Sequence, residues 1–392
     1  MRAGIHKGAM SALAGGHLGT DFANGSLPAL LPFLTDSFSL SYTLAAGLML
    51  ASAASSSLVQ PFFGLWSDRH GASWLLPTGV AIAGVGIGLA AAAPSYWLVL
   101  VFVVVSGLGV AAYHPEGSKF AAYASGSKRA SGMSAFAIGG NIGFALGPIV
   151  ATSLVLWLGL RGGLLLALPP LAIAVALFVL LPFLRTFVPE RSVERRTAGE
   201  DRPGPLTILL AVIGFRSLAW WGLLTFVPLW EVSLGHSKAY GNHLLALMLL
   251  VGGVGTIVVG PLADRIGRRP VLIASLAAAA PLILVFVVVG GAVGAIALAL
   301  TGITVVGTFG LTMVMAQEYL PQHIGLASGL SIGFSIGLGG VAALGLGALA
   351  DAVDLKAALY VSAAAPLAAL ALTLLLPSTR TRRQFEPEIA VP

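Results

Sequence analysis

The chain has 392 residues, of which 57% are hydrophobic and only 9% are charged, and its formal net charge is +6. This composition, with a mean hydropathy of +0.95, excludes a water-soluble globular protein and predicts one that crosses a membrane many times. The sequence contains no cysteine, which excludes disulfides and thiolate metal sites.

Runs of about 20 apolar residues, the length that crosses a hydrocarbon core, recur along the whole chain. We predict an all-α membrane protein with twelve transmembrane helices. Their ranges are 9–34, 42–66, 73–93, 95–117, 130–156, 162–184, 206–231, 239–262, 270–290, 293–317, 324–350 and 356–376. The first run begins like a signal peptide but continues to Leu34, so we interpret it as a retained helix.

The positive charges follow the positive-inside rule. If the N-terminus is cytoplasmic, nearly all lysines and arginines fall in cytoplasmic segments, and Arg161, Arg216, Lys238 and Lys356 fall elsewhere. The net charge therefore indicates membrane topology and not a nucleic-acid surface. We expect a multi-pass protein of a bacterial cytoplasmic membrane with both termini in the cytoplasm.

The second half of the chain repeats the first. "GLWSDRHGAS" begins at Gly64 and "GPLADRIGRR" at Gly260, while "ASGMSAFAIGG" from Ala130 matches "ASGLSIGFSIG" from Ala327. A charged stretch at 185–205 separates the two copies. We predict two pseudo-symmetric six-helix halves, 1–184 and 206–376, a cytoplasmic linker at 185–205 and a cytoplasmic tail at 377–392. This arrangement is typical of secondary transporters.

The two loop sequences resemble the Gly-x-Leu-x-Asp-Arg-x-Gly motif of the major facilitator superfamily. The resemblance implies a gate in which Gly64 allows a close approach between helices and Asp68 faces a helix N-terminus, where a carboxylate is favoured. The remaining gating residues that it implies are Arg69, Asp264 and Arg265. The alternative is a solvated turn whose charges only set topology.

Nearly the whole chain resembles one group of that superfamily, the fosmidomycin-resistance exporters. The stretches that carry the resemblance are "GHLGTDFANGSLPALLPFL", "SSSLVQPFFGLWSDR", "YHPEGSKFAAYASGSKRASGMSAFAIGGNIGFALGP", "GFRSLAWWGLLTFVPLW" and "AQEYLPQHIGLASGLSIGF". The resemblance implies a proton-coupled exporter of drugs or other small organic compounds. We expect an antiporter, acting as a monomer, that needs no cofactor or metal.

His17 and Asp21 lie one helical turn apart in the first span. An ionised Asp at a helix centre costs about 2.5–3.5 kcal/mol on insertion scales, so packing alone does not explain it. Residues four apart share one face of a helix, which lets the pair share a proton. We interpret the pair as a proton-coupling site; the alternative is a structural hydrogen bond between helices.

The run "YHPEG" at 113–117 closes the fourth predicted helix. Pro115 removes a backbone donor, so we expect it to kink or end the helix. We assign His114 and Glu116 to proton coupling and Tyr113 to cargo binding. The alternative for Glu116 is an ordinary interfacial charge at a helix end.

Arg216 lies near the middle of the seventh predicted helix and needs an anion or a water-filled cavity. We predict that it binds an anionic group of the cargo, with Trp220 one turn away offering a ring face and Asn141 adding a polar contact. A static salt bridge to the other half is the alternative. Gly143 and Gly147, followed by Pro148, resemble part of an antiporter signature or serve plain helix packing.

Other classes of function are disfavoured. There is no zinc-protease, nucleophile-elbow or phosphate-loop motif, so we expect no enzyme, and transport must run on a gradient. The two-half repeat favours a carrier over a channel. The remaining alternative is a proton-coupled importer of small organic anions, which would use the same acids and the same Arg216.

Overall fold

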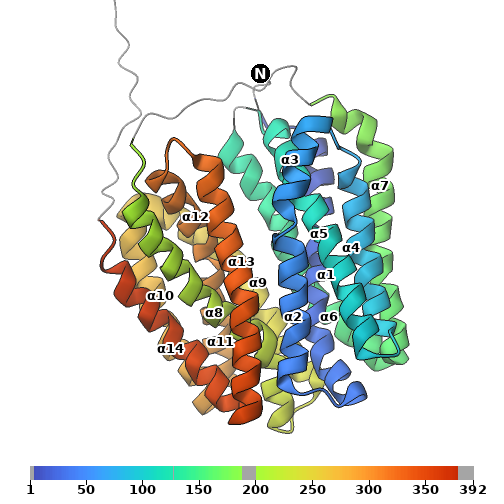
Figure 1. Ribbon diagram of the computed structural model, residues 1–392, viewed down its shortest axis with the longest axis vertical. Coiled ribbons are helices and arrows are strands. Elements are labelled where there is room, and N and C mark those ends of the chain that lie inside the picture. Colours follow the sequence, from blue (N-terminus) through green and yellow to red (C-terminus); the bar gives the residue numbers. More distant parts are fainter. Residues whose placement is uncertain (1–3, 127, 188–199, 378–392) are drawn as a thin grey trace, which may run out of the picture.

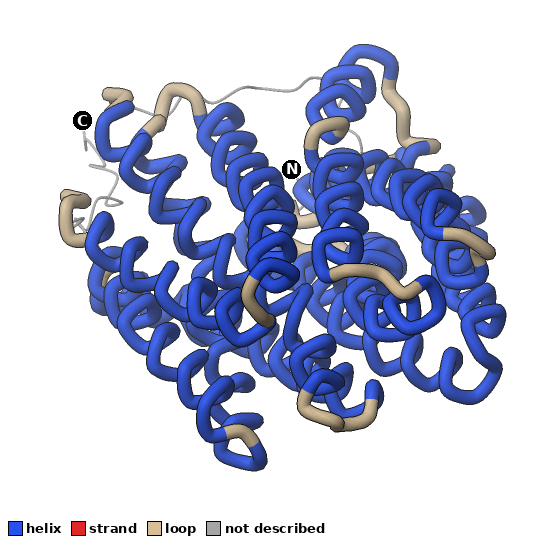
Figure 2. The backbone as a smooth tube through the Cα atoms, turned by 60° about the horizontal axis from the view of Figure 1, so that its bottom comes forward, coloured by secondary structure: helices blue, strands red, loops and turns tan. Residues whose placement is uncertain are grey.

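A computed structural model describes residues 4–126, 128–187 and 200–377 of the chain, with backbone alone for 68–70, 129–130 and 324–325. Within these residues the chain forms fourteen α-helices and one short 3-10 helix, and it forms no strand. Short loops join most of the helices (Figure 2).

The first group of helices is called the N-terminal bundle here. It consists of α1 (Lys7–Phe38), α2 (Tyr42–Ser57), α3 (Gln60–His70), α4 (Leu75–Ala92), α5 (Tyr96–Ala124), α6 (Arg129–Gly162), the 3-10 helix η1 (Gly163–Ala167) and α7 (Leu168–Arg185). Figure 1 shows these helices side by side in one half of the molecule.

The second group, the C-terminal bundle, fills the other half (Figure 1). It consists of α8 (Pro203–Ser233), α9 (Lys238–Ile266), α10 (Arg268–Val289), α11 (Gly291–Val306), α12 (Thr308–Tyr319), α13 (Ile324–Ala352) and α14 (Leu355–Thr373). The first ends of α1 and α8 and the last ends of α7 and α14 lie at one end of the molecule, which we call the termini side; the opposite end is the far side.

Hydropathy and helix length together fit twelve crossings. Among the described residues, ten helical stretches are long and apolar enough to span a membrane. One of them, Ser131–Arg185, is 55 residues long and holds both α6 and α7. The helix α1 is not among the ten, but its 32 residues are long enough for one more crossing. The protein is therefore an all-α membrane protein, and its helix ends lie within a few residues of most predicted ends.

Three predicted spans differ from the observed helices in where they break or at a proline. The second predicted span is broken into α2 and α3, so that Pro61 sits in the first turn of a new helix, where no N–H is needed. The tenth is broken at Gly307 into α11 and α12. The fourth neither ends nor breaks at Pro115, because α5 continues to Ala124. The prediction that Pro115 closes this helix was wrong in its boundary.

Glycines bring α1 and α6 into backbone contact. A Cβ built on Gly139 would lie 2.1 Å from the backbone oxygen of Ala14, and one on Gly143 would lie 2.1 Å from that of Leu18. Gly147 faces Ser26 in the same way, at 2.6 Å from its backbone nitrogen. Small residues one turn apart therefore let these helices pack closely, which confirms the packing interpretation of Gly143 and Gly147.

The two bundles contact each other mainly toward the far side. There α2 packs against α13, with Gly347 facing Tyr42 and Gly340 facing Ala53. Toward the termini side, α3 continues α2 but packs chiefly on α5 of its own bundle. In Figure 1 the two bundles accordingly separate toward the termini side.

Candidate functional site

Three ionisable side chains from two helices meet inside the N-terminal bundle. The Nε2 atom of His17 lies 3.2 Å from Oδ2 of Asp21, and Nε2 of His114 on α5 lies 3.3 Å from Oδ1 of the same carboxylate. The three side chains are 12%, 24% and 17% exposed for His17, His114 and Asp21. We call this group the His–Asp–His cluster. The predicted pairing of His17 with Asp21 is confirmed, and the structure adds His114 to it.

The second ring nitrogen of each histidine is fixed by a backbone carbonyl. Nδ1 of His17 lies 2.9 Å from the oxygen of Phe136, and Nδ1 of His114 lies 2.9 Å from that of Val110. A carbonyl oxygen can only accept, so both Nδ1 atoms carry hydrogen. In a neutral ring Nε2 then presents a lone pair, yet it faces the carboxylate oxygens of Asp21. The two contacts are therefore attractive only when positive charge is held between Asp21 and the histidines.

The packing of α5 and α6 against α1 fixes the positions of these rings. The ring of Phe136 stacks on His17 with 4.2 Å between centroids. Gly140, one turn further along α6, leaves no room for a side chain, because a Cβ there would lie 2.5 Å from Nε2 of His17 and 2.6 Å from Oδ2 of Asp21. Neither residue was predicted to be part of the site, although Gly140 lies in a glycine-rich run that signals close packing.

Tyr113 is part of this packing, and its hydroxyl is not free to bind a ligand. Its side chain is fully buried, and its hydroxyl donates to the backbone oxygen of Leu13 on α1. It also fills the space that a side chain at Gly16 would need. Its position supports a structural role, and the predicted cargo contact finds no support in it.

Glu116 lies apart from the His–Asp–His cluster. It is 1% exposed and accepts a hydrogen bond from the hydroxyl of Ser67 on α3, while Nζ of Lys119 lies 2.7 Å from the same oxygen. Lys119 also donates to the hydroxyl of Ser67 at 2.6 Å. Glu116 is thus a buried, paired carboxylate that ties α5 to α3, and the interfacial alternative is wrong. Its partners were missed because they depend on how α3 bends away from α2.

Arg216 is buried in the C-terminal bundle, with 1% of its surface exposed. It donates from Nη1 to the backbone oxygen of Val305 at 3.1 Å and from Nη2 to the hydroxyl of Ser335 at 3.3 Å. Its Nε has no hydrogen-bond partner, and among the described residues no carboxylate forms an ion pair with it. The alternative of a static salt bridge to the other half is therefore wrong for the described part of the chain.

The aromatic ring against Arg216 is Phe309, whose centroid lies 3.9 Å from the guanidinium carbon. Trp220, predicted for that place, lies instead between Phe309 at 6.1 Å and Phe144 at 6.3 Å, so it links α12 to α6 of the other bundle. Trp220 is one helical turn from Arg216, which is why it was predicted to face the guanidinium. The packing of α12 against α8 places Phe309 there instead.

Asn141 on α6 also lies at the boundary between bundles. Its amide donates to the hydroxyl of Thr256 on α9 at 3.3 Å, and Gly253 of α9 lies against its side chain. The partner of Asn141 is a protein hydroxyl, and its predicted contact with the cargo stays a prediction.

The gating motif copies lie at the termini-side ends of α3 and α9 and form no described contact between bundles. A Cβ on Gly64 would have only Pro115 as a neighbour, at 3.7 Å, within its own bundle. The carboxylate of Asp264 is 73% exposed and lies 3.8 Å from Arg268 one turn along the chain, and Arg265 is exposed. The side chains of Asp68 and Arg69 lie outside the described residues. Their role as a gate stays a prediction.

Polar contacts between bundles gather on the far side. Asp351 accepts hydrogen bonds from the backbone N–H groups of Tyr42 and Thr43 at 2.8 and 2.9 Å, and Lys238 pairs with Asp36. The buried amide of Asn242 donates to the backbone oxygen of Ala29 at 3.0 Å, which joins α9 to α1. We call these contacts the far-side links, and sequence spacing gave no sign of them.

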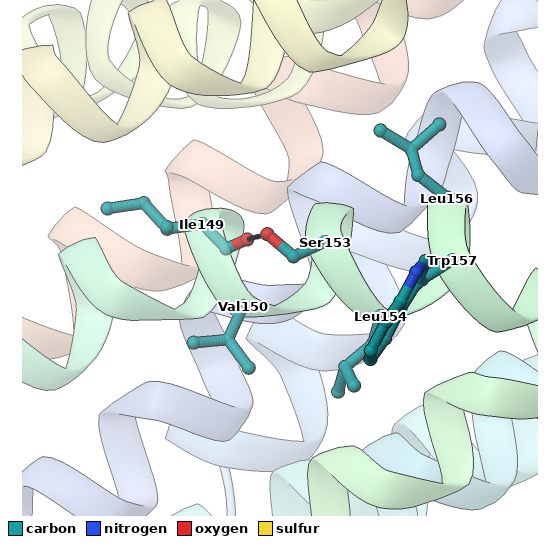
Figure 3. A pocket seen from close by; sticks show the side chains of 6 residues that line it. All are labelled: Ile149, Val150, Ser153, Leu154, Leu156 and Trp157. Carbon is teal, nitrogen blue, oxygen red and sulfur yellow. Dashed lines mark hydrogen bonds between the residues drawn. The ribbon is translucent and has the colours of Figure 1, made fainter.

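A hollow on α6 offers nothing for a charged ligand. Its lining residues are Ile149, Val150, Ser153, Leu154, Leu156 and Trp157 (Figure 3). The hydroxyl of Ser153 donates to the backbone oxygen of Ile149 at 2.8 Å, which leaves an apolar surface. Trp157 is 85% exposed, as befits a side chain that faces lipid. The candidate site is therefore the His–Asp–His cluster together with Arg216.

Two bundles of long apolar helices, with ionisable groups buried inside each bundle, are the architecture of a membrane transporter of the secondary type. The sequence model of the Major Facilitator Superfamily matches residues 13–344 and 209–391. The chain belongs to the Major Facilitator Superfamily.

Two relatives and one solved structure illustrate the kinship. The chain is 31% identical to the fosmidomycin resistance protein of Escherichia coli, over 95% of this chain and 93% of that protein. It is 32% identical to YfnC of Bacillus subtilis, described as an uncharacterized transporter of the same superfamily, over 94% of this chain and 92% of that one. A bacterial homologue of the human lysosomal transporter Spinster, in an inward-facing and occupied conformation, has the same fold with a TM-score of 0.77, 15% identity, and coverage of 94% and 96%.

Proposed function

We propose that this protein is a proton-coupled antiporter that exports a small organic compound by alternating access. It lies in a bacterial cytoplasmic membrane with both termini in the cytoplasm, and it works as a monomer built from halves 1–184 and 206–376. The termini side is then the cytoplasmic side. The likeness to a fosmidomycin resistance protein over nearly the whole chain supports export as the direction.

The His–Asp–His cluster is the observation that carries the coupling. Its two Nε2···O contacts need positive charge between Asp21 and the histidines, and protons supply it. An ionised Asp in a membrane helix is costly without a positively charged partner. The protonated cluster is therefore more stable than the deprotonated one. Proton loss leaves a carboxylate facing two lone pairs, which favours rearrangement of α1 against α5. Coupling follows if proton release and cargo binding favour different arrangements of the two bundles.

Arg216 is the group that we assign to cargo. A guanidinium that is buried, lacks an acidic partner among the described residues and has a free Nε attracts an anionic group. Phe309, which lies against the guanidinium, and Trp220, whose ring centroid lies 6.1 Å from that of Phe309, offer ring surface to an apolar part of the same cargo. Fosmidomycin is the first compound to test, because the relative from Escherichia coli is named for resistance to it.

Arg216 also supports a second candidate function, import of a small organic anion together with protons. Such an importer needs the same cation and the same proton site. The two functions differ in the direction in which cargo moves relative to the proton flow.

Proteoliposomes with an imposed pH gradient test both. Protein is inserted in a known orientation, loaded cargo is followed in time, and the gradient is collapsed with a protonophore. Export requires cargo to move against the proton flow, whereas movement with the protons supports the importer. Asp21→Asn should abolish accumulation against a gradient and retain cargo-for-cargo exchange, while Asp354→Asn, an exposed capping residue at the start of α14, should behave as the natural protein. Normal accumulation by Asp21→Asn would refute the coupling role.

A further inference from the structure

We propose that the His–Asp–His cluster is also a binding site for a divalent transition-metal ion, with Zn²⁺ as the best fit, and that the bound metal inhibits transport. The inference concerns regulation of the site on which the proposed function rests, and it depends on the site's geometry alone. No ligand motif in the sequence predicts it, because the donors come from two helices.

The spacing of the donor atoms suits a small metal ion. One atom each from His17, Asp21 and His114 can be chosen so that all three lie within 4.8 Å of one another. In a tetrahedral zinc site with bonds of about 2.0–2.1 Å, neighbouring donors lie roughly 3.3–3.4 Å apart. Nε2 of His17 lies 3.2 Å from Oδ2 of Asp21 and Nε2 of His114 lies 3.3 Å from Oδ1, so each imidazole is at about that separation from one carboxylate oxygen. An ion bound by all three groups therefore draws the two rings closer together around the carboxylate.

The orientation of the histidines is the one that metal ligands adopt. In metal sites the coordinating ring usually donates its other N–H to a backbone carbonyl or carboxylate, which fixes the tautomer and directs a lone pair at the ion. Both rings of the cluster have this arrangement, with Nδ1 bound to Phe136 on α6 and to Val110 on α5. The two Nε2 atoms then present lone pairs to the two oxygens of the Asp21 carboxylate, one from each side.

The ligand set selects the class of metal. Two imidazoles and one carboxylate suit Zn²⁺, Co²⁺, Ni²⁺ or Cu²⁺, whereas Mg²⁺ and Ca²⁺ prefer oxygen ligands. Three protein ligands leave a coordination position for water. The partial exposure of all three side chains, between 12% and 24%, gives an ion and its water a way in.

Inhibition follows from charge and volume. A divalent ion places positive charge where the proposed coupling protons sit, and it holds α1 and α5 together through ligands on each. Protons and metal therefore compete for the same lone pairs. A metal-bound protein keeps its fold but cannot empty the cluster, so transport stops until the ion leaves.

The test is direct metal binding by the full-length protein in detergent, after removal of any histidine tag. Co²⁺ is titrated and followed by its visible absorption, which reports coordination by nitrogen and oxygen ligands, and Zn²⁺ is then added in competition. We expect one ion per chain at this site, displaced by Zn²⁺ and unaffected by excess Mg²⁺. His17→Gln and His114→Gln, on different helices, should each weaken binding by more than about 10-fold. His243→Gln, an exposed histidine at the start of α9, is the matched control and should bind as the natural protein.

Size-exclusion profiles identify which variants are folded. Because two histidine variants are made, the test can still be read if one of them does not fold. Metal binding by folded His17→Gln or His114→Gln with unchanged affinity would overturn the proposal, as would absence of binding by the natural protein. The measurement uses neither cargo nor a proton gradient. A protein that binds metal but fails to couple transport to protons would thus refute the proposed function alone, and the reverse result would refute the metal site alone.

Discussion

The carboxylate of Asp351, at the end of α13, accepts hydrogen bonds from the backbone N–H and the hydroxyl of Thr43, in the first turn of α2. A residue of one bundle thereby caps a helix of the other, in the position where a carboxylate best complements unpaired N–H groups and the helix dipole. Both groups are on the far side, so this link holds the bundles together there while they separate toward the termini side.

Asp351→Ala should shift the protein toward an arrangement that opens on the far side. Loss of a capping side chain costs about 0.5–2 kcal/mol, which changes a two-state population several-fold or more. Because the natural chain has no cysteine, Leu65→Cys on α3 and Leu326→Cys on α13 can carry spin labels for distance measurement. We expect the population of short distances on the termini side to rise.

Asp354→Ala is the control for this experiment. Asp354 is also a capping residue on the far side, but it binds the N–H of Ala357 within its own bundle. If Asp351→Ala and Asp354→Ala give the same distance distribution, the contact between Asp351 and Thr43 does not set the balance between the two arrangements.

Gly140→Ala should disturb the His–Asp–His cluster specifically. The added Cβ would lie within 2.6 Å of both His17 and Asp21, so one of these side chains must move. We expect a folded protein that loses gradient-driven transport and binds Co²⁺ more weakly. Gly333→Ala, where nothing lies within 4 Å of the new Cβ, should retain both. Coupled transport at the natural rate in Gly140→Ala would show that the geometry of the cluster is not needed.

Glu116→Gln should lower thermal stability by removing the buried carboxylate that pairs with Lys119 and accepts a hydrogen bond from Ser67. Breaking a fully buried ion pair costs about 3–5 kcal/mol, and we expect less here because the Lys119 side chain is 23% exposed. Replacing both residues, as Glu116→Gln with Lys119→Met, should recover part of the loss, since both members of the ion pair are then removed together. Thermal unfolding of the purified variants measures both. A double variant less stable than Glu116→Gln alone would mean that Lys119 supports the fold through other contacts.

Arg216→Lys should weaken cargo binding by more than about 10-fold and leave the protein folded. Lysine keeps the charge but loses the planar face on Phe309 and the paired donors to Val305 and Ser335. Ser335→Ala removes one of these hydrogen bonds only, so a smaller loss is expected. Cargo affinity and folded yield are measured together. Natural affinity with a reduced yield would assign Arg216 to stability and not to cargo.

The sequence by itself determined the all-α membrane class of the fold, the internal repeat of its motifs and the pairing of His17 with Asp21. Each of these depends on properties that are local along the chain. Apolar runs report the lipid that will surround a helix, and a spacing of four residues places two side chains on one face whatever the helix packs against.

Only the tertiary structure decided which distant groups share a site. His114 joins Asp21, Glu116 instead pairs with Lys119 and Ser67, and Phe309 takes the place expected for Trp220. In a membrane, hydropathy hardly distinguishes lipid from a neighbouring helix, so it does not fix the rotation or axial offset of one helix against another. Close glycine contacts such as those between α1 and α6 set that register, and the register selects the partners of each buried polar side chain.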